Sequence, residues 1–178
     1  MQKLNYLFFF VLIFNFSYAQ KNTTQVLDEA LVKAKKENKH VFINYLTSSS
    51  KLSQKMKQQM KNEHFQSLIS SNYIVVNINV SKEEASEYYT CSNPMKSMSN
   101  NNCEAMKFPF WYILDSDGNH IGTSIKDGNN NIGYPTTKEA ISDFVQVIEN
   151  TSDFKADKLS LITDSFNKMN AEKLYSAK

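Results

Sequence analysis

One stretch constrains the fold more than any other, residues 40–56, with the sequence HVFINYLTSSSKLSQKM. Its first half consists of apolar, β-branched and aromatic residues, which are typical of a buried strand. A serine-rich turn follows, and Leu52, Met56 and Met60 then recur at helical spacing. We therefore predict a strand, a tight turn and a helix that buries these three side chains. A solvent-facing turn on a rigid scaffold is a place where a fold can put chemistry.

The turn itself is polar and uncharged from Thr47 to Ser50, and Ser53 follows three residues later. A serine hydroxyl can accept from the free N–H groups of a first helical turn, so Ser49 or Ser50 is the predicted N-cap. A serine could also be a hydrolytic nucleophile, but it would need a base within hydrogen-bond reach. The only histidines are at positions 40, 64 and 120, and none has a recognisable spacing to the turn. Capping is the favoured interpretation.

Periodicity and turn signals predict the other elements. Helices are predicted at 22–38, 50–61, about 65–69, 82–90, 136–148 and from 153 onward, and strands at 41–46, 73–80, 108–114 and 120–125. Capping boxes at Ser81-x-x-Glu84 and Thr136-x-x-Glu139 begin two of the helices, and the last helix has one apolar face with Leu159, Ile162, Phe166 and Met169. The order starts with parallel strands and ends in an antiparallel hairpin. It predicts an α/β fold with a central mixed sheet, helices on both faces and an extra C-terminal helix.

Composition narrows the function classes. The chain has 178 residues, enough for one domain with its own core, and its 20 basic residues, all lysine, nearly balance 18 acidic ones. Nucleic-acid and phosphate sites favour arginine and clustered positive charge, so we expect no nucleic-acid partner.

The N-terminus has the pattern of a secretory signal peptide over residues 1–19. Lys3 precedes eight apolar residues at 7–14, and Ser17-Tyr18-Ala19 fits a cleavage site before Gln20. The apolar run is shorter than the roughly 20 residues that a membrane span needs, although an uncleaved anchor is the alternative. We expect an exported protein, periplasmic or secreted, that leaves the membrane after cleavage. Its main domain would cover residues 20–150 and a helical extension residues 151–178.

Residues 40–56 resemble the active-site segment of the thioredoxin family, in which a strand runs into W-C-x-x-C-K-x-M. The residues after that motif match Gln54, Lys55 and Met56, so Ser50-Lys51-Leu52-Ser53 occupies the place of Cys-x-x-Cys. The resemblance extends over about residues 26–148 and implies a thioredoxin-like fold.

Two further positions belong to this resemblance. Asn44 falls where many thioredoxins have a buried aspartate, and Phe108-Pro109 matches the family's cis-proline. A serine forms no disulfide, so the usual thiol exchange cannot occur at Ser50 and Ser53. Asn44 favours a natural loss of the site over an introduced pair of serines. Without the thiols, the function that the resemblance still implies is peptide binding at Ser49, Ser50, Phe108 and Pro109. Exposed aromatic residues such as Tyr134 would contribute to this surface. We expect no cofactor.

The loop at 91–107 contains both cysteines, Cys91 and Cys103. In an exported protein they are interpreted as a structural disulfide, which contributes about 3 kcal/mol through loop closure. The resemblance places this loop beside the former active-site turn, so a redox role for Cys103 stays open. Copper(I) binding with the nearby Met95, Met98 and Met106 is disfavoured, because the loop has no histidine and a disulfide would consume both thiols.

Three functions follow from the sequence. The favoured one is a thioredoxin-fold protein without a dithiol site that binds a peptide or protein partner at the former active-site surface. The second is a thiol-disulfide oxidoreductase or isomerase that uses Cys91 and Cys103. The third is a docking module in which the C-terminal helix forms the interface.

Overall fold

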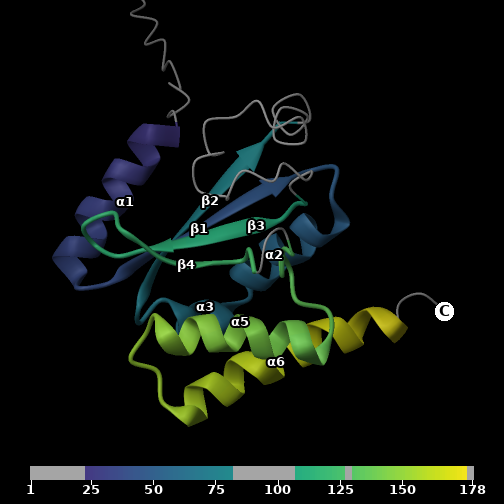
Figure 1. The fold of residues 1–178 in the computed structure, drawn as a ribbon. Coiled ribbons are helices and arrows are strands. Elements are labelled where there is room, and N and C mark those ends of the chain that lie inside the picture. Colours follow the sequence, from purple (N-terminus) through teal and green to yellow (C-terminus); the bar gives the residue numbers. More distant parts are fainter. Residues whose placement is uncertain (1–22, 82–106, 127–129, 176–178) are drawn as a thin grey trace, which may run out of the picture.

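The computed structural model describes residues 23–81, 107–126 and 130–175. Its elements are α1 (Thr23–Glu37), β1 (His40–Thr47), α2 (Lys51–Lys61), α3 (Glu63–Ile69), β2 (Tyr73–Val80), β3 (Phe110–Leu114), β4 (His120–Thr123), α5 (Lys138–Asn150) and α6 (Ala156–Tyr175) (Figure 1). The predicted order is confirmed for these residues. The predicted signal peptide, the 82–90 helix with its capping box and the cysteine loop lie outside the described residues.

The four strands form one mixed sheet in the order β2-β1-β3-β4. β1 pairs with β2 in parallel and with β3 antiparallel, and β3 and β4 form the predicted hairpin. The turn of that hairpin is at Asp115, whose carboxylate accepts from the Asp117 and Asn119 N–H groups, and Gly118 has a φ of +88°. The mixed α/β architecture is therefore as predicted.

β1 is the central strand, and every residue from 41 to 47 is buried, on both faces of the sheet. Phe42 and Leu46 point into a core formed with α2, α3, α5 and α6. Val41, Ile43 and Tyr45 point into a second core beneath α1. Figure 1 shows α1 on one side of the sheet and α5 and α6 on the other. This burial on both faces explains why the sequence of β1 is a nearly continuous apolar run and does not alternate between apolar and polar residues.

The C-terminal helix α6 is part of the larger core. Phe166 is fully buried and meets the rings of Phe65, Tyr134 and Phe144 edge to face, with centroids 5.4, 5.6 and 4.9 Å away. The predicted apolar face is confirmed, with Leu159 and Ile162 buried and Met169 packed at its margin. The same core includes the ring of Trp111.

The predicted burial of Leu52 in the core is wrong. Leu52 is 40 % exposed, whereas Ser53 and Gln59 are buried with Met56 and Met60. Each helical residue turns by about 100°, so positions 53, 56 and 60 stay on one face while position 52 lies beside it.

Three predicted boundaries also change. α5 is capped by Thr137, not Thr136, because the Thr137 hydroxyl accepts from the Ala140 N–H at 3.2 Å. β3 begins at Phe110, after Pro109, which has no N–H to give a sheet. β4 ends at Thr123, and Ile125 forms an isolated bridge with Asn131 instead. Within the described residues, no helix combines the length and apolar character that crossing a membrane requires.

We predict that Phe166→Ala lowers the free energy of unfolding by about 3–5 kcal/mol, because it empties an enclosed site in the core. Leu161→Ala on the same helix is the matched control, since Leu161 is 41 % exposed, and we expect a change within about 0.5 kcal/mol. Urea denaturation followed by the fluorescence of Trp111, the single tryptophan, measures both variants. Equal changes in the two would show that α6 is not part of the core.

Candidate functional site

The turn after β1 is held by its own hydrogen bonds. Ser50, with φ −98° and ψ 121°, is the N-cap of α2, and its hydroxyl accepts from the Ser53 N–H at 3.2 Å. The hydroxyls of Thr47 and Ser49 lie 3.1 Å apart, and the Gln54 side-chain amide donates to the Ser48 carbonyl at 3.0 Å. The predicted capping role therefore belongs to Ser50, while Ser49 is exposed at the tip of the turn.

The same hydroxyl joins the turn to a distant segment. Ser50 Oγ donates to the carbonyl oxygen of Phe108 at 3.0 Å, across 58 positions in the sequence. The antiparallel pairing of Tyr45 with Phe110 makes this contact possible, because it sets the start of β3 beside the end of β1. The Phe108–Pro109 peptide bond is cis, and both residues are buried. The structure thus brings Ser49, Ser50, Phe108 and Pro109 into one place.

Two residues that the sequence did not single out hold the segment at 107–109. The Asn131 side-chain amide donates to the carbonyl oxygens of Lys107 and of Pro109, the latter at 2.9 Å, and its oxygen accepts from the Gly133 N–H at 2.9 Å. Gly133 has a φ of +55°, and a Cβ there would lie 2.9 Å from the Pro109 oxygen. A side chain at this position would both strain the backbone and collide with Pro109.

Beneath the turn, the two positions expected to be chemically active in a thioredoxin are neutral. Ser53 is buried, and within the described residues its hydroxyl has no hydrogen-bond partner. Asn44 is also fully buried, and its amide donates to the side-chain oxygen of Asn77 on β2 at 3.1 Å. Neither side chain ionises at neutral pH, so position 53 supplies no thiolate and position 44 supplies no carboxylate.

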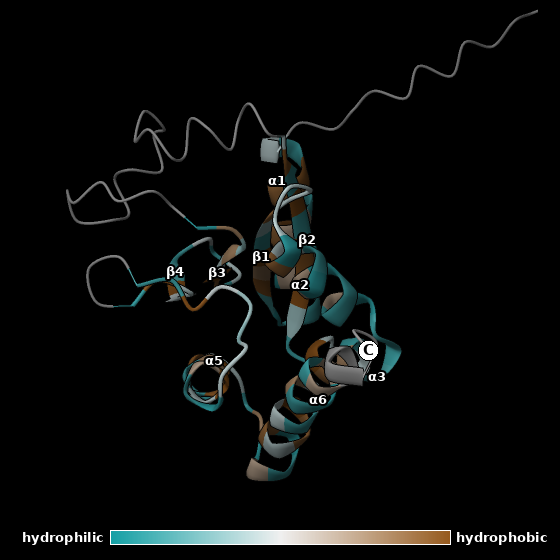
Figure 2. Ribbon diagram, turned by 90° about the vertical axis from the view of Figure 1, so that its right-hand side faces the viewer, coloured by the Kyte–Doolittle hydropathy of each residue, from teal (hydrophilic) through white to brown (hydrophobic). Residues whose placement is uncertain are grey.

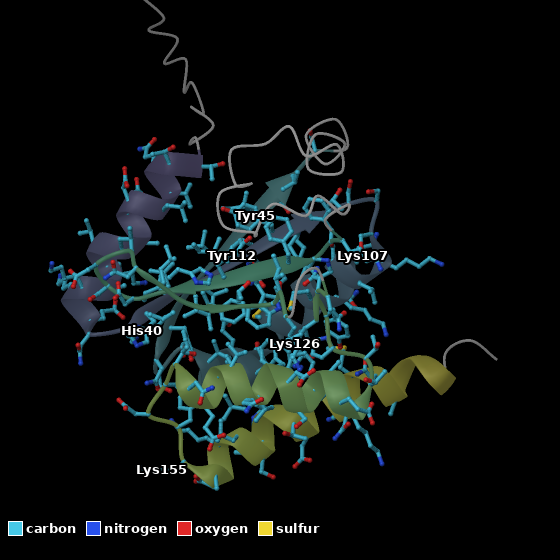
Figure 3. All side chains as sticks on the ribbon, viewed as in Figure 1. His40, Tyr45, Lys107, Tyr112, Lys126 and Lys155 are labelled. Carbon is cyan, nitrogen blue, oxygen red and sulfur yellow. The ribbon has the colours of Figure 1, made fainter. Side chains whose placement is uncertain are left out.

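A catalytic pair of Ser50 with a histidine is ruled out by distance. His40 begins β1 and Ser50 follows its end, and eight strand residues span roughly 23 Å from first to last. His120 lies at that same far end, since it pairs with Leu114 and Leu114 pairs with Val41. Figure 3 shows His40 at the opposite end of the sheet from Lys107. His64 follows the far end of α2, about 16 Å along the helix.

A hollow of about 460 Å³ lies beside the turn, between the ends of β1 and β2 and the first two turns of α2. Ser53, Gln54 and Lys57 are among its lining residues. α2 has four lysines, Lys51, Lys55, Lys57 and Lys61, and no acidic residue. Its N-terminus adds the positive end of the helix dipole, so the surface attracts negative charge.

Tyr134 was predicted to be an exposed aromatic residue, and this prediction is wrong. It is only 2 % exposed, and burial raises its pKa to about 12. The ammonium group of Lys55 lies 5.5 Å from the centre of its ring. Tyr134 therefore supports α2 from the core side and offers no aromatic surface to a ligand. The predicted cysteine pair, Cys91 and Cys103, and the methionines considered for copper lie outside the described residues.

We predict that Asn131→Ala lowers the free energy of unfolding by about 1–3 kcal/mol, because two backbone carbonyls and one N–H lose their partner. The adjacent Asn130→Ala is the control, since Asn130 is exposed. Thermal or urea denaturation compares the two variants. If both lose the same amount of stability, Asn131 does not hold the proline segment.

Comparison with known proteins agrees with this geometry. Residues 27–128, more than half of the chain, match the model of a thioredoxin-like domain. The crystal structure of a disulphide isomerase from Xylella fastidiosa Temecula1 is 17 % identical and has a TM-score of 0.53, with 74 % of this chain and 94 % of that chain covered.

Two more solved structures are more distant. A DsbH oxidoreductase is 14 % identical with a TM-score of 0.45, and a thioredoxin from Thermus thermophilus is 12 % identical with a TM-score of 0.39; each comparison covers 68 % of this chain and 81 % of the other. Among curated protein sequences none matches. The match to the domain model, together with the mixed sheet and the turn that meets a proline segment, shows that the chain belongs to the thioredoxin-like family.

Proposed function

We propose that this protein binds an extended segment of a partner protein, without thiol exchange, at a surface formed by residues 47–53 and 107–109, here called the turn surface. The observation that carries the proposal is the hydrogen bond from Ser50 Oγ to the Phe108 carbonyl. It holds the turn and the proline segment together through a group that cannot form a disulfide. The surface of a thioredoxin-like site is preserved while its redox chemistry is absent.

The backbone at 107–109 is suited to an extended ligand. Asn131 fixes the carbonyls of Lys107 and Pro109, and Gly133 lies against Pro109, so this segment loses little conformational freedom when a partner binds. A segment that pairs with backbone groups at the end of a sheet gains affinity from its main chain and specificity from neighbouring pockets. The 460 Å³ hollow beside Ser53 is such a pocket.

The charge of the turn surface indicates the kind of partner. Lys51 and Lys107 are exposed on this surface, and Lys57 is exposed at the hollow beside it. Carboxylates gain energy beside a helix N-terminus and near ammonium groups. The proposed partner segment therefore contains aspartate or glutamate. We also propose that residues 1–19 direct export, so that the partner is met in the periplasm or outside the cell.

We predict that Ser49→Trp weakens binding of an unfolded protein about tenfold, on the order of 1.4 kcal/mol, because an indole at the exposed tip of the turn would occupy space on the turn surface that the partner segment needs. The probe is fluorescently labelled ribonuclease that has been reduced and carboxymethylated, which keeps it unfolded and acidic. Fluorescence anisotropy measures its affinity.

Ser67→Trp is the matched control for this experiment. Ser67 is exposed on α3, and its hydroxyl makes one local hydrogen bond, as that of Ser49 does. Its variant should bind as the unchanged protein does. The proposal is wrong if the unchanged protein shows no affinity for the probe, or if both tryptophan variants bind equally well.

The absence of thiol exchange has its own test in the Cys91 and Cys103 pair. We predict a structural bond with a reduction potential below about −300 mV, which glutathione does not reduce. Thiol labelling of the protein across glutathione buffers measures this potential. A value near −200 mV, with one cysteine labelled preferentially, would instead support an oxidoreductase that works through this loop.

A further inference from the structure

β2 is the edge strand of the sheet as far as the described residues show. The strand labels in Figure 2 run in the order β4, β3, β1 and β2, with β2 outermost. The His40 N–H donates to the Asn72 carbonyl, and His40 is in register with Tyr73. In a parallel ladder this register turns the backbone groups of Ile74 and Val76 toward β1. Those of Val75 and Asn77 then point away from the sheet.

A groove of about 320 Å³ follows this free edge. One wall comes from the end of α1 and includes Lys33 and Glu37. The opposite wall comes from α2 and α3 and includes the apolar side chains of Met60, Phe65 and Ile69. Helices thus flank both faces of the space in which a further strand would continue the sheet. Strand addition needs a row of unpaired backbone N–H and C=O groups, and among the described residues β2 presents them between α1 on one side and α2 and α3 on the other.

Positive charge surrounds the groove. Lys33, Lys39 and Lys61 contribute to its lining, against the single carboxylate of Glu37. Glu37 is already paired, with Lys39 at 2.7 Å and with Lys33 at 3.9 Å. Lys61, at the end of α2, is exposed on the other side of the groove. An incoming strand therefore meets a surplus of positive charge.

The charge distinguishes between possible occupants. A second copy of this chain paired through β2 would bring two sets of these lysines together, and like charges at close range are unfavourable. Edge lysines are one way in which proteins prevent such self-pairing. An acidic strand would instead neutralise the surplus. Its apolar residues, which alternate with the acidic ones, would lie beside Ile74 and Val75, which are half-buried at this edge.

We propose that the outer edge of β2 is a second binding surface, which takes an extended acidic segment of a partner protein as an added strand. This surface is separate from the turn surface, and the proposal does not depend on binding there. The two are distinguishable because different variants block them.

The experiment uses two labelled peptides, one in which valine alternates with glutamate and one in which valine alternates with lysine. The glutamate peptide should bind at least tenfold more tightly in fluorescence anisotropy. Lys61→Glu should weaken its binding about tenfold, and Lys138→Glu, an exposed lysine at the start of α5, should leave it unchanged. Ser49→Trp at the turn surface should also leave it unchanged.

Hydrogen exchange gives the readout that is specific to strand pairing. Bound glutamate peptide should slow exchange of the Val75 and Asn77 amides, and Val75→Pro, which removes an outward N–H, should weaken binding while the pairing with β1 persists. If the proline variant does not fold, the binding of the Lys61→Glu variant and the hydrogen-exchange data test the proposal instead. The proposal is overturned by equal binding of both peptides, by a Lys61→Glu variant that binds normally, or by self-association through β2 in sedimentation.

Discussion

The two-sided burial of β1 is the constraint on which the rest of the structure depends. Because Phe42 and Leu46 pack under four helices while Ile43 and Tyr45 pack under α1, the strand can neither shift its register nor turn over. Its end is therefore fixed against the start of β3. That fixed end places Ser50 within hydrogen-bond distance of Phe108. The candidate site follows from the packing of the central strand.

At this position the choice of hydroxyl over thiol decides the chemistry. A thiol at a helix N-terminus would ionise readily and exchange with disulfides. The Ser50 hydroxyl stays protonated and is already engaged twice, as acceptor from Ser53 and as donor to Phe108. The neutral pair of Asn44 and Asn77 below it agrees with this. In the function we propose, the geometry that would orient a redox partner holds a partner segment without reacting with it.

Periodicity predicted the elements of the described residues, because long apolar repeats such as those of β1, β2 and α6 reflect burial directly. It did not predict the burial or the role of a residue whose position depends on a single tertiary contact. Leu52 matched a helical repeat yet lies one position from the buried face, and Tyr134 gave no sign that α6 would cover it. Asn131 lies at the end of a run of three asparagines, and only the fold shows which of them turns toward Pro109.

The most direct test of the central idea is a nitrogen–proton NMR titration of the labelled protein with carboxymethylated ribonuclease. Binding at the turn surface predicts concentration-dependent shifts at Ser48 to Gln54, at Lys107 to Phe110 and at Asn131 to Gly133. Signals from the hairpin turn at Asp115 to Asn119, at the opposite end of the sheet, should stay in place. Shifts confined to other parts of the chain, or no shifts at concentrations where anisotropy detects a complex, would contradict the account.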